Sequence, residues 1–328
     1  MGQAQESSVL LKVKDLRIHF EMEKEIVEAV NGISFEIHKG ETLGFVGETG
    51  AGKTTTALGI MRLVQSPPGR IVTGSIELNG EDLLQKSEAA MRKIRGNQIS
   101  MIFQDPMTSL NPVIPVGDQI QEVIQLHNKI PASEAAKRAI DMLEMVGIPG
   151  ERYNEYPHQF SGGMKQRVVI ALALACKPEL LIADEPTTAL DVTIQAQVLD
   201  MMRDLKQKIG TSMLMITHDL GVIAETCDKV AIVYAGQIVE YGTVWHIFDN
   251  PQHPYTIGLF GSLPSLNKDV HRLTPIEGLV PNPADLPAYC SFYDRCKSRC
   301  VCCKEGEPEM REIEPGHFVA CFCTKGGC

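Results

Sequence analysis

The sequence lacks several features that would place it in particular protein classes. No apolar run approaches the roughly 20 residues that a membrane-spanning helix requires, and residues 1–16 lack the apolar core and cleavage site of a signal peptide. Basic residues are not in excess, since 31 Lys and Arg stand against 41 Asp and Glu, for a net charge of −10. A nucleic-acid partner is therefore not expected, because neutralising phosphates requires a basic surface. We expect the protein to be made and kept in the cytoplasm.

Cysteine is scarce over most of the chain and concentrated at its end. Of ten cysteines, Cys176 and Cys227 stand alone, and the other eight lie between Cys290 and Cys328. In a reducing cytosol such a cluster is more often metal-binding than disulfide-bonded. The rest of the composition, with 44% hydrophobic and 22% charged residues, is that of an ordinary globular protein. A length of 328 residues allows one large domain with an appendage, or two modest domains.

The most informative motif is a glycine-rich loop at residues 47–54, which lies between an apolar run at 42–46 and a helical pattern at 55–62. Its glycines let backbone N–H groups approach an anion, and the start of the helix adds favourable potential. Lys53 supplies a charge for the β- and γ-phosphates, and the Thr54 hydroxyl can bind Mg²⁺. A glycine-rich turn could resemble this motif, but the flanking strand and helix favour a nucleoside triphosphate site. The residues expected to contact the nucleotide here are Gly47, Glu48, Thr49, Gly50, Ala51, Gly52, Lys53, Thr54 and Thr55.

Other segments have simple secondary-structure patterns. Alternating apolar residues predict strands at 10–20 and 27–37, and Phe20 either stacks on an adenine ring or faces the core. The prolines of segment 106–115 exclude regular helix there, whereas 116–147 follows a helical pattern that Gly147 and Pro149 end. Further strands are expected at 74–80, 99–103, 180–183 and 212–217, and a helix at 168–175.

Polar residues follow several of these apolar segments. Two glycines in Ser161-Gly162-Gly163 precede a helix and present free N–H groups to an anion. The strand at 180–183 delivers Asp184 and Glu185 at its carboxyl end, the edge where open α/β sheets bind ligands. Asp184 is expected to hold Mg²⁺ through its water shell, and Glu185 to act as general base for a hydrolytic water. His218, after the strand at 212–217, either bonds the γ-phosphate or the attacking water, or is structural.

The types of these motifs and their order along the chain resemble those of the nucleotide-binding subunit of an ATP-binding-cassette (ABC) transporter. The resemblance covers roughly the first 250 residues. The resemblance implies an α/β fold: a RecA-like P-loop NTPase core with an antiparallel β subdomain, an inserted α-helical subdomain at about 107–175 and a small Cys-rich C-terminal extension. The expected domains are residues 1–250 and 251–328. The motifs that carry the resemblance are the glycine loop, Gln104, Ser161-Gly162-Gly163, Asp184-Glu185, Ala189-Leu190-Asp191 and His218.

The resemblance also implies how an ATPase of this kind works. Two cassettes pair head to tail, so that each ATP lies between the glycine loop of one chain and Ser161-Gly162-Gly163 of the other, and Asp191 links the two sites. Gln104 senses the γ-phosphate and joins Thr54 and Asp184 around Mg²⁺. The implied partners are a second cassette, identical or related, two integral-membrane permease subunits and an extracellular or periplasmic solute-binding protein. The chain would then be peripheral, on the cytoplasmic face of the cell membrane.

A finer resemblance links the chain to the importers of oligopeptides, dipeptides and nickel. It rests on residues 103–112, on Met164 and on the segment His253-Pro254-Tyr255-Thr256. The implied solute is a di- or oligopeptide, and nickel or another small solute is the alternative. A soluble cassette ATPase acting on DNA or ribosomes is disfavoured, because the chain has one cassette, no sustained heptads and no basic patch. A catalytically inactive regulatory binder is disfavoured by intact Lys53, Asp184, Glu185 and His218.

The same subfamily includes members with a [4Fe-4S] cluster near the C-terminus, and Cys290, Cys296, Cys303 and Cys321 fall at the matching positions. The spacing C-x5-C-x6-C is not that of ferredoxins. Tyr289, Asp294 and Lys297 also depart from the glycine and proline usual beside these cysteines. Four thiolates would equally suit Zn²⁺, and unliganded thiols are a third possibility. A bound cluster is expected to be structural. Four extra thiols leave the ligand set open: Cys300, Cys302, Cys323 and Cys328.

Overall fold

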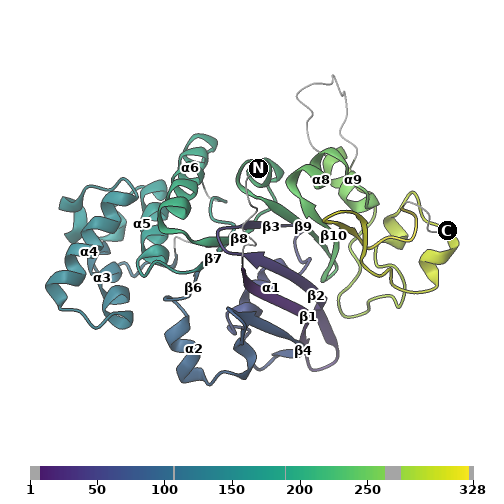
Figure 1. Ribbon diagram of the computed structural model, residues 1–328, viewed down its shortest axis with the longest axis horizontal. Helices are drawn as coiled ribbons and strands as arrows, with labels where there is room; N and C mark the ends of the chain where they lie inside the picture. The colour runs from purple at the N-terminus through teal and green to yellow at the C-terminus, as the bar shows by residue number, and fades with distance from the viewer. Residues whose placement is uncertain (1–7, 106–107, 189, 263–274, 325–328) are drawn as a thin grey trace. The chain divides into compact units, whose positions relative to one another are not determined.

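The computed structural model describes residues 8–105, 108–188, 190–262 and 275–324 (Figure 1). The chain divides into two compact units. Unit 1 contains the residues up to 12, 36–42 and 77–217, and unit 2 contains 13–35, 43–76 and the residues from 218 onward. The domain boundary expected near residue 250 stays a prediction. Met107, Ala189 and Cys328, which the sequence motifs include, lie outside the described residues.

A parallel sheet forms the centre of unit 1. Its strands are β6 (Ile99–Ile102), β7 (Leu180–Asp184) and β8 (Ser212–Ile216), in the order β8-β7-β6. All their residues are buried, as expected for parallel strands covered on both faces, and this confirms the strands predicted from continuous apolar runs. Because the strands are parallel, their carboxyl ends share one edge, and the polar residues that follow them meet there.

Helices cover this sheet and form the helical region of unit 1. The pattern at 116–147 is not one helix. α3 (Val116–His127) ends at His127, and α4 (Ala132–Met145) begins after Pro131, because proline is tolerated at a helix start but not inside one. α3 and α4 pack on each other and on α5 (Gly162–Leu174), as Figure 1 shows. The structure also describes α2 (Glu88–Ile94) and α6 (Val192–Ile209) in this unit, with short 3₁₀ turns at Leu83–Gln85, Gly150–Asn154 and Pro157–Gln159.

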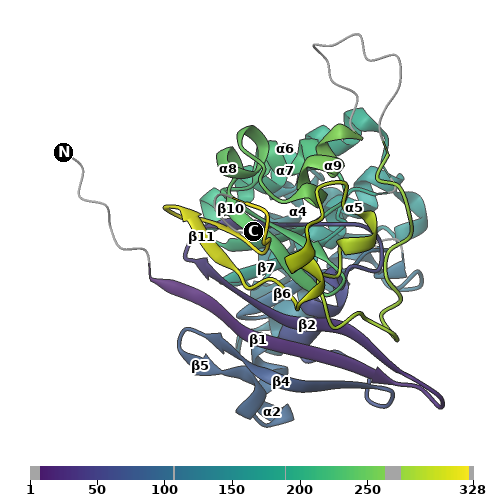
Figure 2. The ribbon, with the colours of Figure 1, turned by 90° about the vertical axis from the view of Figure 1, so that its right-hand side faces the viewer.

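Unit 2 contains most of two long strands, β1 (Val9–Glu21) and β2 (Ile26–His38), joined by residues 22–25. They confirm the two predicted N-terminal strands. β4 (Gly69–Leu78) follows β1 in the order β2-β1-β4, which Figure 2 shows, and its end pairs with the two-residue strand β5 (Glu81–Asp82) in unit 1. The predicted strand at 74–80 is thus the end of a longer one.

Another set of paired strands in unit 2 carries the glycine loop. β3 (Thr42–Val46) is parallel to β9 (Lys229–Tyr234), and β9 is antiparallel to β10 (Gln237–Thr243). The chain end continues this sheet, because β12 (His317–Val319) pairs with β10 and β11 (Arg311–Glu314) pairs with β12. The sequence motifs did not predict β9 to β12. The helices of this unit are α1 (Lys53–Ile60), α7 (Leu220–Thr226), α8 (Val244–Asp249) and α9 (Pro254–Gly261), with short 3₁₀ turns Tyr293–Arg295 and Val301–Lys304.

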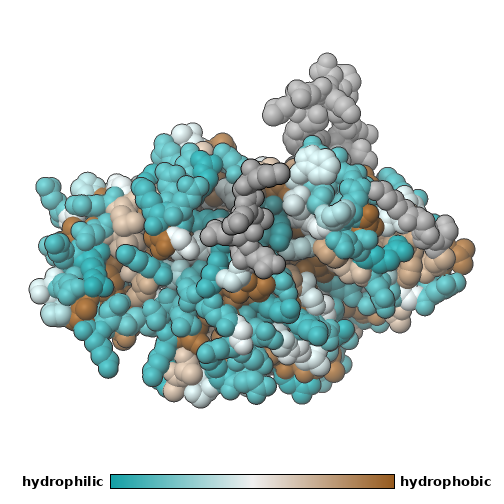
Figure 3. All heavy atoms as spheres, viewed as in Figure 1, coloured by the Kyte–Doolittle hydropathy of each residue, from teal (hydrophilic) through white to brown (hydrophobic). Residues whose placement is uncertain are grey.

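Apolar side chains are used mainly for the interior. Within the described ranges, the helices are too short or too polar to cross a bilayer. α6, with 18 residues, buries Val198, Leu199, Met202 and Leu205 on one face and carries charged residues elsewhere. On the face drawn in Figure 3, hydrophobic residues form small groups separated by hydrophilic ones.

Candidate nucleotide-binding site

The glycine loop has the tight geometry that its sequence predicts. A Cβ atom at Gly47 would lie 2.1 Å from the carbonyl oxygen of Val233, and one at Gly52 would lie 2.4 Å from that of Ala29. Gly52 also has a φ of 97°, in the left-handed region that favours glycine. Side chains at these two positions would therefore displace neighbouring backbone and open the loop.

Lys53, the first residue of α1, is folded back over the loop. Its Nζ donates to the carbonyl oxygens of Gly47 at 2.7 Å and Glu48 at 3.0 Å, and the residue is 7% exposed. No side chain caps the start of α1 at Gly52. A helix start binds anions through its first N–H groups, and Lys53 adds a positive charge at this end of α1. Thr54 and Thr55 are half-buried, and Thr49 and Gly50 are exposed, so their predicted contacts with Mg²⁺ or nucleotide stay predictions.

The acidic pair lies at the carboxyl edge of the parallel sheet in unit 1. Asp184 ends β7 and is 1% exposed, whereas Glu185 is half-buried. Glu185 has a φ of 48°, an uncommon conformation for a residue with a side chain and one that is concentrated at functional sites. Its N–H donates to the carbonyl of Ile216 at 2.8 Å, which fixes the turn to the neighbouring strand β8.

Gln104 and Glu185 come together, as expected for residues that follow adjacent parallel strands. The Glu185 Oε2 atom accepts hydrogen bonds from Gln104 Nε2 at 3.3 Å and from Thr188 Oγ1 at 2.9 Å. Gln104 follows β6 and is exposed. The carboxylate is therefore held in place at the edge of the sheet, and a general base needs such a fixed position. Sequence reasoning did not identify Thr188.

The predicted glycine pair forms the first two residues of α5 and lines a hollow in unit 1. Ser161 caps α5, accepting from the Met164 N–H at 3.4 Å, and Asp191 caps α6, accepting from Thr193 and Ile194 N–H groups at 3.1 and 3.0 Å. The hollow has a volume of about 510 Å³. It brings the predicted signature and Asp191 together. Its lining residues are Ser161, Gly162, Gly163, Met164, Arg167, Leu190, Asp191, Ile194 and Gln197.

Two predicted residues have roles that the geometry leaves open. Phe20 lies in β1, is half-buried, and has its ring beside Gly69, where an added Cβ would be 3.0 Å from Phe20 Cε1. Its stacking on adenine stays a prediction. His218 is exposed, belongs to unit 2 and directly precedes the Asp219 cap of α7. Its contact with a γ-phosphate also stays a prediction.

The C-terminal cysteines lie close together, but in a different grouping from the predicted one. The sulfur atoms of Cys300, Cys303 and Cys323 lie within 4.8 Å of one another, and their pairwise separations are 3.4, 3.8 and 3.1 Å. Of the four predicted ligands, only Cys303 belongs to this triad. Three thiols at such separations suit a soft metal ion. Cys302, one of the four extra thiols that left the ligand set open, is disulfide-bonded.

The other three predicted ligands interact electrostatically with Cys303. The Cys290 N–H donates to the carbonyl of Cys303 at 3.2 Å. Burial, and to a smaller extent repulsion from Cys303, Cys321 and Cys296, raises the pKa of the Cys290 thiol to about 11. Burial also raises the pKa values of Cys296 and Cys321. Thiols that repel one another when ionised gain most from a cation, which would hold them as thiolates.

The sequence patterns did not identify two residues whose side chains contact the glycine loop. The Tyr255 hydroxyl, fully buried, accepts the Glu48 N–H at 2.9 Å. Arg295 forms an ion pair with the Glu48 carboxylate at 2.8 Å. Tyr255 lies in a segment that carries the family resemblance, but no pattern in the neighbouring sequence predicts its contact with the glycine loop. Arg295 is 247 residues from Glu48 along the chain, beyond the reach of any pattern of spacing.

Comparison with known proteins gives consistent matches. The family model "ABC transporter" matches residues 30–188, and the model "Oligopeptide/dipeptide transporter, C-terminal region" matches residues 239–303. The chain is 51% identical over 317 residues to the oligopeptide transport ATP-binding protein AppD of Bacillus subtilis, with 96% of this chain and 97% of that protein covered. It is 48% identical over 320 residues to the oligopeptide transport ATP-binding protein OppD of Escherichia coli, covering 97% and 94% respectively.

Solved structures agree in fold. The dimeric post-hydrolysis state of the ATP-binding cassette MJ0796, bound to ADP and Pi, superposes with a TM-score of 0.65 at 25% identity and covers 72% of this chain and 99% of that one. The cbiO1 protein of Clostridium perfringens, part of the ABC transporter complex cbiONQ, gives a TM-score of 0.63 at 25% identity, covering 74% and 91%. The α/β cassette fold, with its β subdomain and helical region, is confirmed.

Proposed function

Since this chain belongs to the family of ABC transporter ATP-binding proteins of the oligopeptide and dipeptide type, we infer that it hydrolyses ATP to energise the uptake of di- or oligopeptides. The observation that carries this inference is the identity of about half of all residues along nearly the whole chain, including the C-terminal region. An importer of nickel or another small solute would use the same machinery. The residues that select the solute lie outside this chain. A transport assay is therefore needed to distinguish peptides from nickel or another small solute.

The glycine loop supplies the site for ATP in this proposal. Lys53 binds the β- and γ-phosphates, and the N–H groups of the loop surround them. Mg²⁺ is held by the Thr54 hydroxyl, Gln104 and the buried Asp184 carboxylate, whose hard oxygen atoms suit this ion. Phe20 stacks on the adenine. The remaining loop residues contribute backbone groups: Gly47, Glu48, Thr49, Gly50, Ala51, Gly52 and Thr55.

Hydrolysis uses the edge of the parallel sheet. Glu185 takes a proton from the attacking water, and its hydrogen bonds from Gln104 and Thr188 support this role because they fix the carboxylate. Gln104 detects the γ-phosphate, and His218 bonds the γ-phosphate or the water. Catalysis then consists mainly of positioning and charge stabilisation around the transferred phosphoryl group.

A second cassette completes each ATP site. The hollow lined by Ser161, Gly162, Gly163 and Asp191 supports this step, because two helix N-termini open into it and no nucleotide-loop residue lies among its lining. The γ-phosphate of the ATP bound by one chain would occupy the hollow of the other, so that binding closes the pair and hydrolysis releases it. MJ0796 is a dimeric cassette.

The cysteines are proposed to hold a metal centre. Cys290, Cys296, Cys303 and Cys321 are assigned as ligands of a [4Fe-4S] cluster, with Zn²⁺ as the alternative; the triad of Cys300, Cys303 and Cys323 is the competing ligand set. Clustered thiols on short turns fit either group, since both are bound by thiolates. When bound, the centre would cross-link the turns of the C-terminal extension.

The remaining partners follow from transport. Two permease subunits and an extracellular or periplasmic binding protein would complete the importer, and the chain would be peripheral on the cytoplasmic face of the membrane. The test is reconstitution of the chain with its permeases and binding protein in vesicles. ATP turnover and uptake should both rise with added di- or oligopeptide, and both should be lost in Lys53→Ala. Stimulation by nickel and not by peptide would overturn the peptide assignment.

A further inference from the structure

The carboxylate of Glu48, a residue of the glycine loop, forms a bidentate ion pair with the guanidinium of Arg295. Arg295 Nη1 and Nη2 each donate to one Glu48 oxygen, at 2.8 and 2.9 Å. The side chains are 6% and 28% exposed for Arg295 and Glu48 respectively. Two parallel hydrogen bonds between planar, charged groups make the strongest kind of side-chain pair, and partial burial limits screening by salt.

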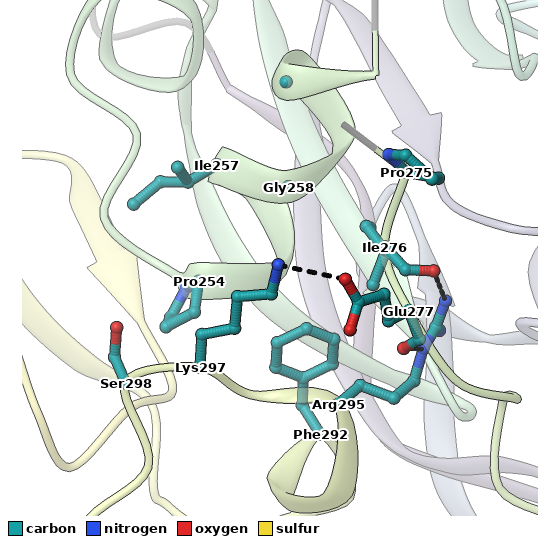
Figure 4. Close-up of a pocket in the computed structure, with 11 residues that line it drawn as sticks. Pro254, Ile257, Gly258, Pro275, Ile276, Glu277, Phe292, Arg295, Lys297 and Ser298 are labelled. Atoms are coloured by element: carbon teal, nitrogen blue, oxygen red, sulfur yellow. Dashed lines mark hydrogen bonds and ion pairs between the residues drawn. The ribbon is translucent and has the colours of Figure 1, made fainter. Parts of the chain in front are cut away.

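Arg295 is itself fixed by several neighbours. Its Nε donates to the Glu277 carbonyl at 3.3 Å, and its guanidinium lies 5.7 Å from the centre of the Tyr234 ring. Figure 4 shows Arg295 extended toward the carbonyl of Ile276, beside Phe292, at the wall of a cavity of about 300 Å³. The guanidinium therefore reaches Glu48 from a rigid position and not from a freely moving side chain.

Glu48 takes part in the loop through its backbone as well. Its carbonyl accepts from Lys53 Nζ at 3.0 Å and from the Ala51 N–H at 3.1 Å, and its N–H donates to Tyr255. A movement of Glu48 would therefore be transmitted to Lys53, the residue that meets the phosphates. Glu48 also places a negative charge in a loop whose purpose is to attract the anionic triphosphate.

We propose that Arg295 is a positioning residue of the ATP site, which cancels the charge of Glu48 and so keeps the electrostatic potential of the glycine loop favourable for the triphosphate. The C-terminal extension thereby sets the affinity of the loop for ATP. The inference rests on the proposed function, since it takes residues 47–54 as the ATP site. Arg295 directly precedes Cys296, so the turn that carries it is the one that the proposed metal ligands Cys290 and Cys296 enclose.

The test measures binding of a non-hydrolysable ATP analogue with Mg²⁺ to the full-length protein. Arg295→Ala should raise the dissociation constant about tenfold, the size of typical couplings between contacting charged residues. Adding Glu48→Gln to that variant should restore binding to within about threefold of the wild type, because the uncompensated charge is then gone. Glu48→Gln alone should bind at least as tightly as the wild type. Lys297→Ala, which removes an exposed ammonium next to the same cavity, is the control and should change nothing.

The proposal is overturned if Arg295→Ala binds the ATP analogue as tightly as the wild type. It is also overturned if the double variant binds as weakly as Arg295→Ala, because Arg295 would then act only through packing. If Arg295→Ala does not fold, Glu48→Gln decides: weakened binding in that variant contradicts charge cancellation. A wild-type chain that binds no ATP analogue overturns the proposed function itself.

Discussion

The imidazole of His317 in β12 and the carboxylate of Glu240 in β10 lie 2.8 Å apart, Nε2 to Oε1, and both side chains are fully buried. The same carboxylate accepts the backbone N–H groups of Gln252 at 2.8 Å and His253 at 2.9 Å. One buried side chain thus joins the last strands of the chain to the start of α9. A buried carboxylate is tolerated because it has several donors.

Replacing Glu240 by Ala should destabilise unit 2. The His317 ring and two backbone N–H groups would lose their acceptor, at a cost of about 3 kcal/mol in the free energy of unfolding. Denaturant unfolding measures the loss, and limited proteolysis should show earlier cleavage within residues 311–319. Glu307→Ala removes an exposed carboxylate that accepts from the Gln237 side chain, and should cost less than about 0.5 kcal/mol. Equal effects of the two variants would refute the role given to Glu240.

Replacing Glu185 by Gln should abolish hydrolysis and spare binding. The amide keeps the size and the contacts with Gln104 and Thr188 but cannot take a proton, so kcat should fall about 100- to 10,000-fold while the KM for ATP changes little. Phosphate release by the full-length chain measures this. Glu134→Gln, which breaks an exposed pair with Arg138 on α4, is the control and should keep its kcat. A Glu185→Gln variant with wild-type turnover would exclude it as the base.

The two signature glycines should respond differently to alanine. An added Cβ at Gly163 would lie 2.7 Å from Ile194 Cγ2, whereas one at Gly162 meets nothing within 4 Å. Gly163→Ala should therefore lower the melting temperature, by overpacking that costs about 1–3 kcal/mol. Gly162→Ala should leave the melting temperature unchanged or slightly higher, since alanine favours helix. Its ATP turnover should nevertheless fall, because the hollow receives the nucleotide of the second cassette. Normal turnover in Gly162→Ala would count against that assignment.

Single serine substitutions should identify the metal ligands. In protein purified without air, we expect iron and sulfide in similar amounts, and loss of both in the variants of Cys290, Cys296, Cys303 and Cys321. The variants of Cys300 and Cys323 should keep the metal, and so should the control Cys176→Ser. Loss of metal from the Cys300 and Cys323 variants, with Cys290 and Cys296 dispensable, would instead establish the triad. A colourless protein with zinc would replace the cluster by a thiolate-bound ion.

Stability should depend on pH through His253. Burial lowers the pKa of His253 from its ordinary value of 6.5 to about 3. Between these values the unfolded chain binds a proton that the folded chain does not, so stability is full above pH 6.5 and falls as the pH drops towards 3. His253→Asn keeps an acceptor for the Tyr255 N–H but removes the titration. From pH 7 to 5 the wild type should lose about 2 kcal/mol more than this variant. Parallel pH profiles of the two proteins would contradict this explanation.

Local patterns in the sequence determined the cassette fold and the motifs of its candidate site. The strands at 42–46, 99–103, 180–183 and 212–217 are predictable because each is a continuous apolar run, which parallel strands covered on both faces require. The glycine loop is predictable because the approach of backbone to backbone excludes side chains at Gly47 and Gly52. The contact between Gln104 and Glu185 is predictable if the two strands that precede them are adjacent and parallel, because the carboxyl ends of such strands lie at one edge of the sheet.

Only the tertiary structure decided what the C-terminal extension contacts. The pairs Glu48–Arg295 and Glu240–His317 join residues that are 247 and 77 positions apart, and neither acidic residue differs by type or spacing from the solvated ones. Pro131 marks the break between α3 and α4 in the sequence, but the helical periodicity on both sides of it predicts one continuous helix. Sequence patterns report which face of an element is apolar; they do not report which distant charge it meets, because that depends on how separate elements pack.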